Sequence, residues 1–184
     1  GSKTHMMQAI FNDKKRPFYN AASQMTISYL PEKDTVEFLQ NNFSRRNIEL
    51  DSEMATCIID VSANIPYYIQ QLASEIWLNI ESNTKITREI IDQCVWRVIA
   101  MKSDYFMELF ENQSASKKQL LVALCTGGEN IFSESYRKTH RLPSSATLQR
   151  AVKGLTQDGV IDKIGSEHFI TDPFFKFYLQ DIAY

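Results

Sequence analysis

Apolar side chains recur at intervals of three and four residues from Val36 to Phe110, and this spacing constrains the fold more than any other feature. It is the spacing of an α-helix that buries one face. Start signals divide the stretch; proline is favourable in a first helical turn, and aspartate caps a helix. The predicted helices begin at Pro31, after Asp51, at Pro66 and after Thr87. The sequence therefore predicts a small four-helix bundle whose last helix ends near Glu111.

A polar stretch, ENQSASKK at residues 111–118, lacks apolar periodicity and indicates a boundary between two modules. We therefore divide the chain into a linker segment over 1–30, a helical domain over 31–112 and a second domain over 113–184. The first helix of that second domain is predicted to start with a capping box formed by Ser116 and Gln119.

The rest of the second domain has a different rhythm. A short helix is predicted over 133–140, and the run SSATLQRAVKGLTQDG predicts a longer one over 144–159. VIDKI and HFI then indicate two short strands around the turn at Gly165 and Ser166. The order helix, helix, helix, hairpin is that of a winged helix. The predicted fold is mainly α, a small helical bundle followed by a winged-helix domain with a short β-hairpin.

Composition excludes several classes of protein. The chain is 43% apolar and 23% charged with a net charge of -2, which is typical of a soluble globular protein. No apolar run approaches the roughly 20 residues that cross a bilayer, so we expect no membrane association and a cytoplasmic location. The three cysteines are scattered without a C-x-x-C pair, which predicts buried reduced thiols and no metal site.

Three motifs together resemble a known family. They are GSKTHMMQAIF followed by RPFY, then NIPYYIQQLASEIW at 64–77, then LPSSATLQRAVKGLTQDGVI with a closing DPFF. The set resembles the C-terminal part of an archaeal-type P-loop ATPase of the AAA+ and STAND superfamily. The first motif is similar to the end of the sensor-1 strand, the second to the lid-domain motif with its central proline, and the third to the terminal winged helix.

The resemblance implies a nucleotide site. Pro66 would pack near the adenine of ATP, with Asn64, Ile65 and Tyr67 beside it, and Lys3 could reach a phosphate. The family often has glycine before this proline, whereas Ala63 and Asn64 stand there in this chain. From the residues alone, Pro66 is first a helix starter.

The chain has no G-x-x-x-x-G-K-[ST] motif, so it lacks the loop that cradles phosphates and the hydroxyl that holds magnesium. We therefore expect no ATP hydrolysis by this chain alone. The resemblance implies that ATP and Mg²⁺ are bound through a P-loop ATPase domain N-terminal to it in the same polypeptide. That longer protein would be the ATPase.

The second domain offers a candidate nucleic-acid face. The outward positions of its 144–159 helix and the hairpin carry polar and basic side chains, namely Ser144, Ser145, Gln149, Arg150, Lys153 and Lys163. Residues 114–184 hold 9 basic and 7 acidic side chains, a balance that permits DNA contact without demanding it. A wing that packs against protein is the other reading, because winged helices also serve as packing modules.

Two hypotheses follow. In the first, the chain is the lid and winged-helix regulatory region of an ATP-driven switch, which couples nucleotide state to the binding of a partner or DNA. In the second, it is a free-standing winged-helix DNA-binding transcriptional regulator with a helical partner-binding bundle. The sensor-like opening and the turn before Pro66 favour the first.

Overall fold

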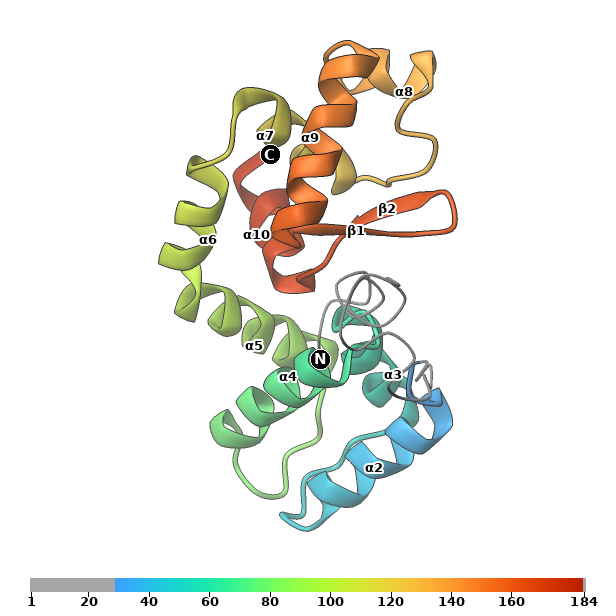
Figure 1. Ribbon diagram of the computed structural model, residues 1–184. Coiled ribbons are helices and arrows are strands. Elements are labelled where there is room, and N and C mark those ends of the chain that lie inside the picture. Colours follow the sequence, from blue (N-terminus) through green and yellow to red (C-terminus); the bar gives the residue numbers. More distant parts are fainter. Residues whose placement is uncertain (1–28, 184) are drawn as a thin grey trace, which may run out of the picture.

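The computed structural model describes residues 29–183, which form helices and one antiparallel hairpin (Figure 1). The N-terminal bundle consists of α2 (Glu32–Ser44), α3 (Ser52–Val61), α4 (Pro66–Asn79) and α5 (Arg88–Met101). The C-terminal module consists of α6 (Ser103–Glu111), α7 (Ala115–Leu124), α8 (Glu134–Thr139), α9 (Ser145–Asp158), β1 (Ile161–Ile164), β2 (Glu167–Ile170) and α10 (Pro173–Ala183). The predicted fold class, mainly helical with one short hairpin, is confirmed.

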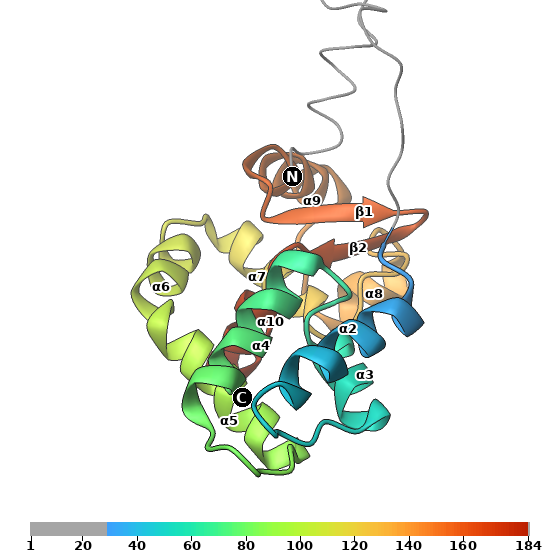
Figure 2. The same cartoon turned by 90° about the horizontal axis from the view of Figure 1, so that it is seen from below.

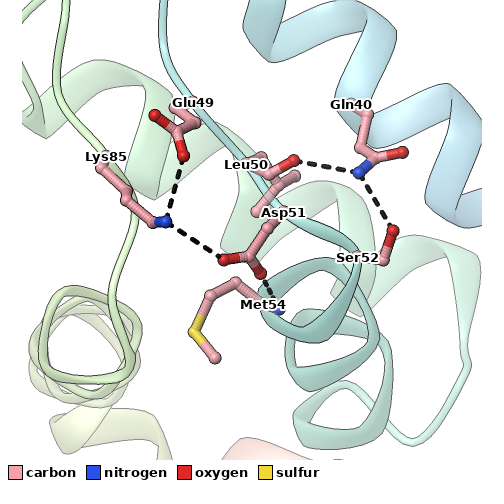
Figure 3. Close-up of polar contacts among 7 residues, drawn as sticks. All are labelled: Gln40, Glu49, Leu50, Asp51, Ser52, Met54 and Lys85. Atoms are coloured by element: carbon pink, nitrogen blue, oxygen red, sulfur yellow. Dashed lines mark hydrogen bonds and ion pairs between the residues drawn. The ribbon is translucent and has the colours of Figure 1, made fainter.

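Polar contacts fix the entry to α3, as Figure 3 shows. The carboxylate of Asp51 accepts a hydrogen bond of 2.9 Å from the backbone N–H of Met54, so the predicted cap is present. Such a cap stabilises a helix by about 1 kcal/mol. The ammonium group of Lys85 lies 3.0 Å from Glu49 and 3.7 Å from Asp51, and Gln40 donates to the carbonyl of Leu50. These contacts join α2, α3 and the segment before α5.

Helices and the hairpin pack closely in the C-terminal module. Helix α9 packs on α7, and β1 pairs with β2 in the register Ile161 opposite Ile170. The segment after α7 lies against β2. The amide of His168 donates a hydrogen bond of 3.0 Å to the carbonyl of Gly128, and the backbone of Glu129 forms an antiparallel β-bridge with that of Glu167. Any side chain at Gly128 would collide with the His168 backbone, since a Cβ there would lie 1.7 Å from its oxygen.

Helix α10 joins the two modules. It contacts α5 of the bundle as well as α6 and α7, and Figure 2 shows it between α7 and α4. Its buried Phe174, Phe175 and Leu179 belong to one apolar core that is continuous with the core of the bundle. The two modules therefore share buried surface rather than being joined only by a linker.

Three details of the sequence reading were wrong. The predicted helix from Thr87 to Glu111 is two helices, because the backbone of Lys102 leaves the helical region (φ -108°, ψ 4°). The predicted capping box is absent: α7 begins at Ala115 after Ser114, and the Ser116 hydroxyl pairs with that of Ser114 at 3.3 Å. No helix was predicted after the hairpin, where α10 lies; DPFF was used only as a closing motif of the family resemblance.

Candidate functional site

The turn between α3 and α4 has an uncommon backbone. Helix α3 ends with two hydrogen bonds, from the amide of Ala63 to the carbonyl of Asp60 and from the amide of Asn64 to that of Ile59, both 2.9 Å. This is a Schellman motif, which places the residue after the cap in the left-handed region. Ala63 and Asn64 both have φ 52°. Asparagine tolerates that conformation, but alanine adopts it at a cost of about 1–2 kcal/mol.

The same turn holds polar atoms without partners. The hydroxyl of Ser62 is completely buried, and neither it nor the side-chain oxygen of Asn64 has a hydrogen-bond partner among the described residues. A buried polar atom without a partner costs about 1–3 kcal/mol. Backbone strain and unpaired polar atoms cluster at functional sites, where a ligand or a moving segment makes use of them.

Helix α4 begins directly after this turn. Pro66 occupies its first position and Ile65 its cap, which supplies no side-chain hydrogen bond, and the first turn contains no acidic residue. The positive end of the helix is therefore not neutralised by α4 itself. Pro66 also lines a groove of about 450 Å³ between α2 and α4, together with Phe38, Phe43 and Trp77.

Tyr67 and Tyr68 point to different surroundings. Tyr67 is 62% exposed, whereas Tyr68 is half-buried and meets the ring of Phe174 edge-on at 5.7 Å. Burial, followed by the adjacent carboxylate of Asp172, raises the pKa of the Tyr68 phenol. The first turn of α4 is thus in contact, through Tyr68, with the first turn of α10.

Lys102 lies at the centre of this contact. Its ammonium group is 3.5 Å from the carboxylate of Asp172 and within 5.8 Å of the ring centroids of Tyr67, Tyr68, Phe106 and Phe174. The other oxygen of Asp172 accepts hydrogen bonds from the first amides of α10. Sequence reasoning did not assign Lys102 or Asp172, although Asp-Pro before an apolar run is a recognisable helix start.

The exposed face of α9 carries most of the predicted nucleic-acid residues. Gln149, Arg150 and Lys153 are exposed on one side of the helix, opposite the buried Leu148, Ala151 and Leu155. Ser144 occupies the N-cap position of α9 without a side-chain cap hydrogen bond, and its hydroxyl donates to that of Thr147; Ser145 is half-buried. The guanidinium of Arg150 contacts only its own helix among the described residues, through Ala146 and Thr147.

Lys163 lies apart from that face, on β1 opposite His168. Helix α8 and the turn after it add cations that the sequence reading did not select: Arg137, Lys138 and Arg141. Arg141 is exposed and has φ 51°, three residues before the cap of α9. These cations could have been selected from the sequence, because the helix that precedes a recognition helix often contacts the DNA backbone.

The predicted nucleotide residues are brought together in part. Asn64, Ile65, Pro66 and Tyr67 are consecutive residues at the start of α4, and the side chain of Asn64 donates to the carbonyl of Leu30 at 3.4 Å. Lys3 lies outside the described residues. Within residues 29–183, no helix has both the length and the apolar character needed to span a bilayer.

Comparison with known proteins bears on both modules. The model of a family described as "probable winged helix domain" matches residues 104–181. This range contains α7, α8, α9, the hairpin and nearly all of α10. Residues 104–181 form a winged-helix domain. The match also includes most of α6, which was assigned from the sequence to the helical domain over 31–112.

The whole fold is similar to a solved structure. A Walker-type ATPase of Pyrococcus abyssi superposes with a TM-score of 0.64 and 16% sequence identity, over 96% of this chain. The chain spans about half of that protein's length, 49%. No curated protein matches the sequence. The likeness establishes that the bundle and the winged-helix domain occur in this arrangement in another protein.

Proposed function

We propose that this chain is the lid and winged-helix region of an ATP-binding protein of the AAA+ and STAND type, in which the winged helix responds to nucleotide. The observation that carries the proposal is the strained turn at 62–66, whose buried polar atoms are unpaired and which stands where the family resemblance places the adenine. The similarity of nearly the whole chain to half of a Walker-type ATPase supports it.

The residues of the turn fit an adenine better than a phosphate. The side-chain oxygen of Asn64 and the hydroxyl of Ser62 are acceptors without partners among the described residues, and because both are buried, an exocyclic amino group would reach them only after the turn opens. Pro66, Ile65 and the exposed ring of Tyr67 offer apolar surface for a purine. No cation occurs between Ser62 and Tyr68, so the phosphates and Mg²⁺ would be held by the P-loop domain of the same polypeptide.

The test is ATP affinity in the longer polypeptide that contains this chain. We expect a native product about twice this length with a phosphate-binding loop upstream. In it, Pro66→Gly should weaken ATP binding about tenfold, because the proline presents a rigid apolar face to the base. Pro143→Gly is the matched control, since this proline lies in the turn before α9. Unchanged affinity in Pro66→Gly would remove the turn from the nucleotide site.

A second function is favoured by one observation on α9. Its exposed face, at Ala146, Gln149, Arg150, Lys153 and Gln157, has no carboxylate, and neither Arg150 nor Lys153 forms an ion pair among the described residues. Free cations on a recognition helix suit phosphate contacts. DNA binding, either within the ATPase or as a free-standing regulator, is therefore the alternative.

Salt dependence separates that alternative from protein packing. Arg150→Ala with Lys153→Ala should lower affinity for duplex DNA at low salt and reduce the slope of log K against log salt by about two. The control is Lys117→Ala with Lys118→Ala, which removes the same charge from amines paired with Asp158 and Glu111. A chain that shows no DNA binding at low salt would exclude the DNA function.

A further inference from the structure

Lys102 occupies an aromatic cage built from both modules. Two of its rings, Tyr67 and Tyr68, come from α4, Phe106 comes from α6, and Phe174 comes from α10. The side chain is only 21% exposed, as is that of its ion-pair partner Asp172. Low exposure strengthens both the cation–π contacts and the ion pair relative to a surface lysine.

Asp172 is shared between this cage and the start of α10. One carboxylate oxygen faces Lys102 at 3.5 Å, and the other accepts from the amides of Phe174 and Phe175 at 2.9 and 3.2 Å. A displacement of Lys102 therefore acts on the group that caps α10. Because α10 also contacts α7 and β2, it acts on the winged-helix domain as a whole.

The other end of the cage is the candidate nucleotide turn. Tyr67 follows Pro66 immediately, its ring is 5.0 Å from that of Tyr68, and its centroid is 5.8 Å from the Lys102 ammonium. Tyr67 is largely exposed, so a ligand or protein at the turn can move it without opening the core. Tyr67, Lys102 and Asp172 thus form a continuous chain of contacts from the turn to α10.

We infer that the caged Lys102 is the physical link by which the turn before α4 controls the docking of α10 and the winged-helix domain. Displacement of the Tyr67 ring removes one wall of the cage, weakens the hold of Lys102 on Asp172, and loosens the first turn of α10. The role of nucleotide as the displacing ligand rests on the proposed function. The link between Tyr67 and α10 is independent of the proposed function.

The experiment uses the 184-residue chain without nucleotide. Hydrogen exchange at the amides of Phe174 and Phe175 reports local opening of the first turn of α10. Tyr67→Ala should raise their exchange about three- to fivefold, the size of one partly exposed cation–π contact. Phe38→Ala is the matched control, because this ring is similarly exposed (65%) but lies on α2. The control should leave both amides unchanged.

The decisive arm repeats Tyr67→Ala in a Lys102→Met background. Methionine keeps the length and apolar character of lysine but removes the charge, so it should itself raise exchange on the order of tenfold. In that background Tyr67→Ala should add nothing further. If Tyr67→Ala has no effect in the wild-type chain, or has its full effect without Lys102, the link is wrong.

A second variant covers the case in which Lys102→Met does not fold. Asp172→Asn keeps a good cap for α10 while removing the charge that faces Lys102, and it should likewise abolish the effect of Tyr67→Ala. Persistence of that effect in Asp172→Asn would contradict the link. The hydrogen-exchange measurements need no ATP. A negative result for Pro66→Gly in ATP binding would therefore not contradict the link, and a negative result in hydrogen exchange would not contradict the proposed function.

Discussion

The turn after α3 and the turn after α9 have the same backbone design but different residues. Each closes its helix with a Schellman pair of hydrogen bonds, and each needs a left-handed residue at the same place. After α9 that residue is Gly159 (φ 70°), and after α3 it is Ala63 (φ 52°). Glycine adopts the conformation without a steric cost, whereas alanine does not. The strain therefore lies in the turn that precedes the candidate nucleotide residues.

The two candidate sites differ accordingly. The turn before α4 combines strain with unpaired buried atoms at Ser62 and Asn64, but it has no charge. The face of α9 is an unstrained helix that carries Arg150 and Lys153. A strained turn that is short of partners suits a specific, shape-dependent ligand, whereas exposed cations on a regular helix suit a polyanion of uniform geometry.

The largest expected effect concerns Gly128 of the winged-helix domain, a position where the backbone of β2 leaves no room for a side chain. Gly128→Ala would place a Cβ against the backbone oxygen of His168, which cannot yield as a side chain does. We expect a loss of about 3 kcal/mol in the free energy of unfolding, measured by urea denaturation.

Gly154→Ala on α9 is its control. There the added Cβ meets only the flexible end of Lys117, at 2.7 Å, so the change should be close to neutral. Equal stability of Gly128→Ala and the wild-type chain would show that β2 does not lie against the segment after α7.

The second prediction replaces Ala63 with glycine, so that the turn after α3 has the same residue type as the turn after α9. Ala63→Gly should relieve about 1–2 kcal/mol of left-handed strain and lose about 0.4–1 kcal/mol through greater freedom of the unfolded chain. The free energy of unfolding should therefore rise by about 0.5–1 kcal/mol. A destabilised variant would mean that the methyl group of Ala63 packs usefully in this turn.

Gly159→Ala makes the opposite change in the winged-helix domain. The same two contributions now change sign, so we expect a loss of about 0.5–1 kcal/mol. Thermal unfolding of both variants beside the wild-type chain gives the comparison directly. Two changes of the same sign would show that the turns are not equivalent, whatever their hydrogen bonds.

These turns also show what sequence could and could not predict. The periodicity of apolar residues located the helices, and Asp51, Pro66 and Gly159 marked their ends, because each acts through a local backbone requirement. The break at Lys102 left no local signal, since helical spacing continues from Val98 to Phe106 on both sides of it. Lys102 is drawn toward Asp172, 70 residues away, and only the tertiary structure brings them together.

The candidate site was predictable to a similar extent. Residues 64–67 were selected as one contiguous motif, and the α9 face follows from helical geometry. The strain at Ala63 and the burial of Ser62 depend on how α3 packs, so no sequence pattern announced them. The function of both sites stays a prediction.

The smallest expected effect concerns pH and acts on the winged-helix domain alone. Burial, followed by the charge of Lys163 across the hairpin, lowers the pKa of His168 below its usual 6.5, while the nearby Gly128 carbonyl acts in the opposite direction. The folded chain therefore favours neutral His168, and below about pH 6.5 the unfolded chain binds the proton more readily. The contribution of His168 to the free energy of unfolding should be complete above that pH, and it should decrease as the pH drops from 6.5 toward the lowered pKa of His168 in the folded chain.

Urea denaturation at several pH values measures this contribution. His168→Leu should remove it, because leucine does not titrate and the buried Nδ1 of His168 has no hydrogen-bond partner among the described residues to lose. Lys163→Met should reduce it, since it takes away the second cause of the shift. The turn before α4 contains no histidine, so Pro66→Gly should keep the wild-type pH dependence. If His168→Leu keeps it too, the pH-dependent group lies elsewhere, and the two modules do not differ in this respect.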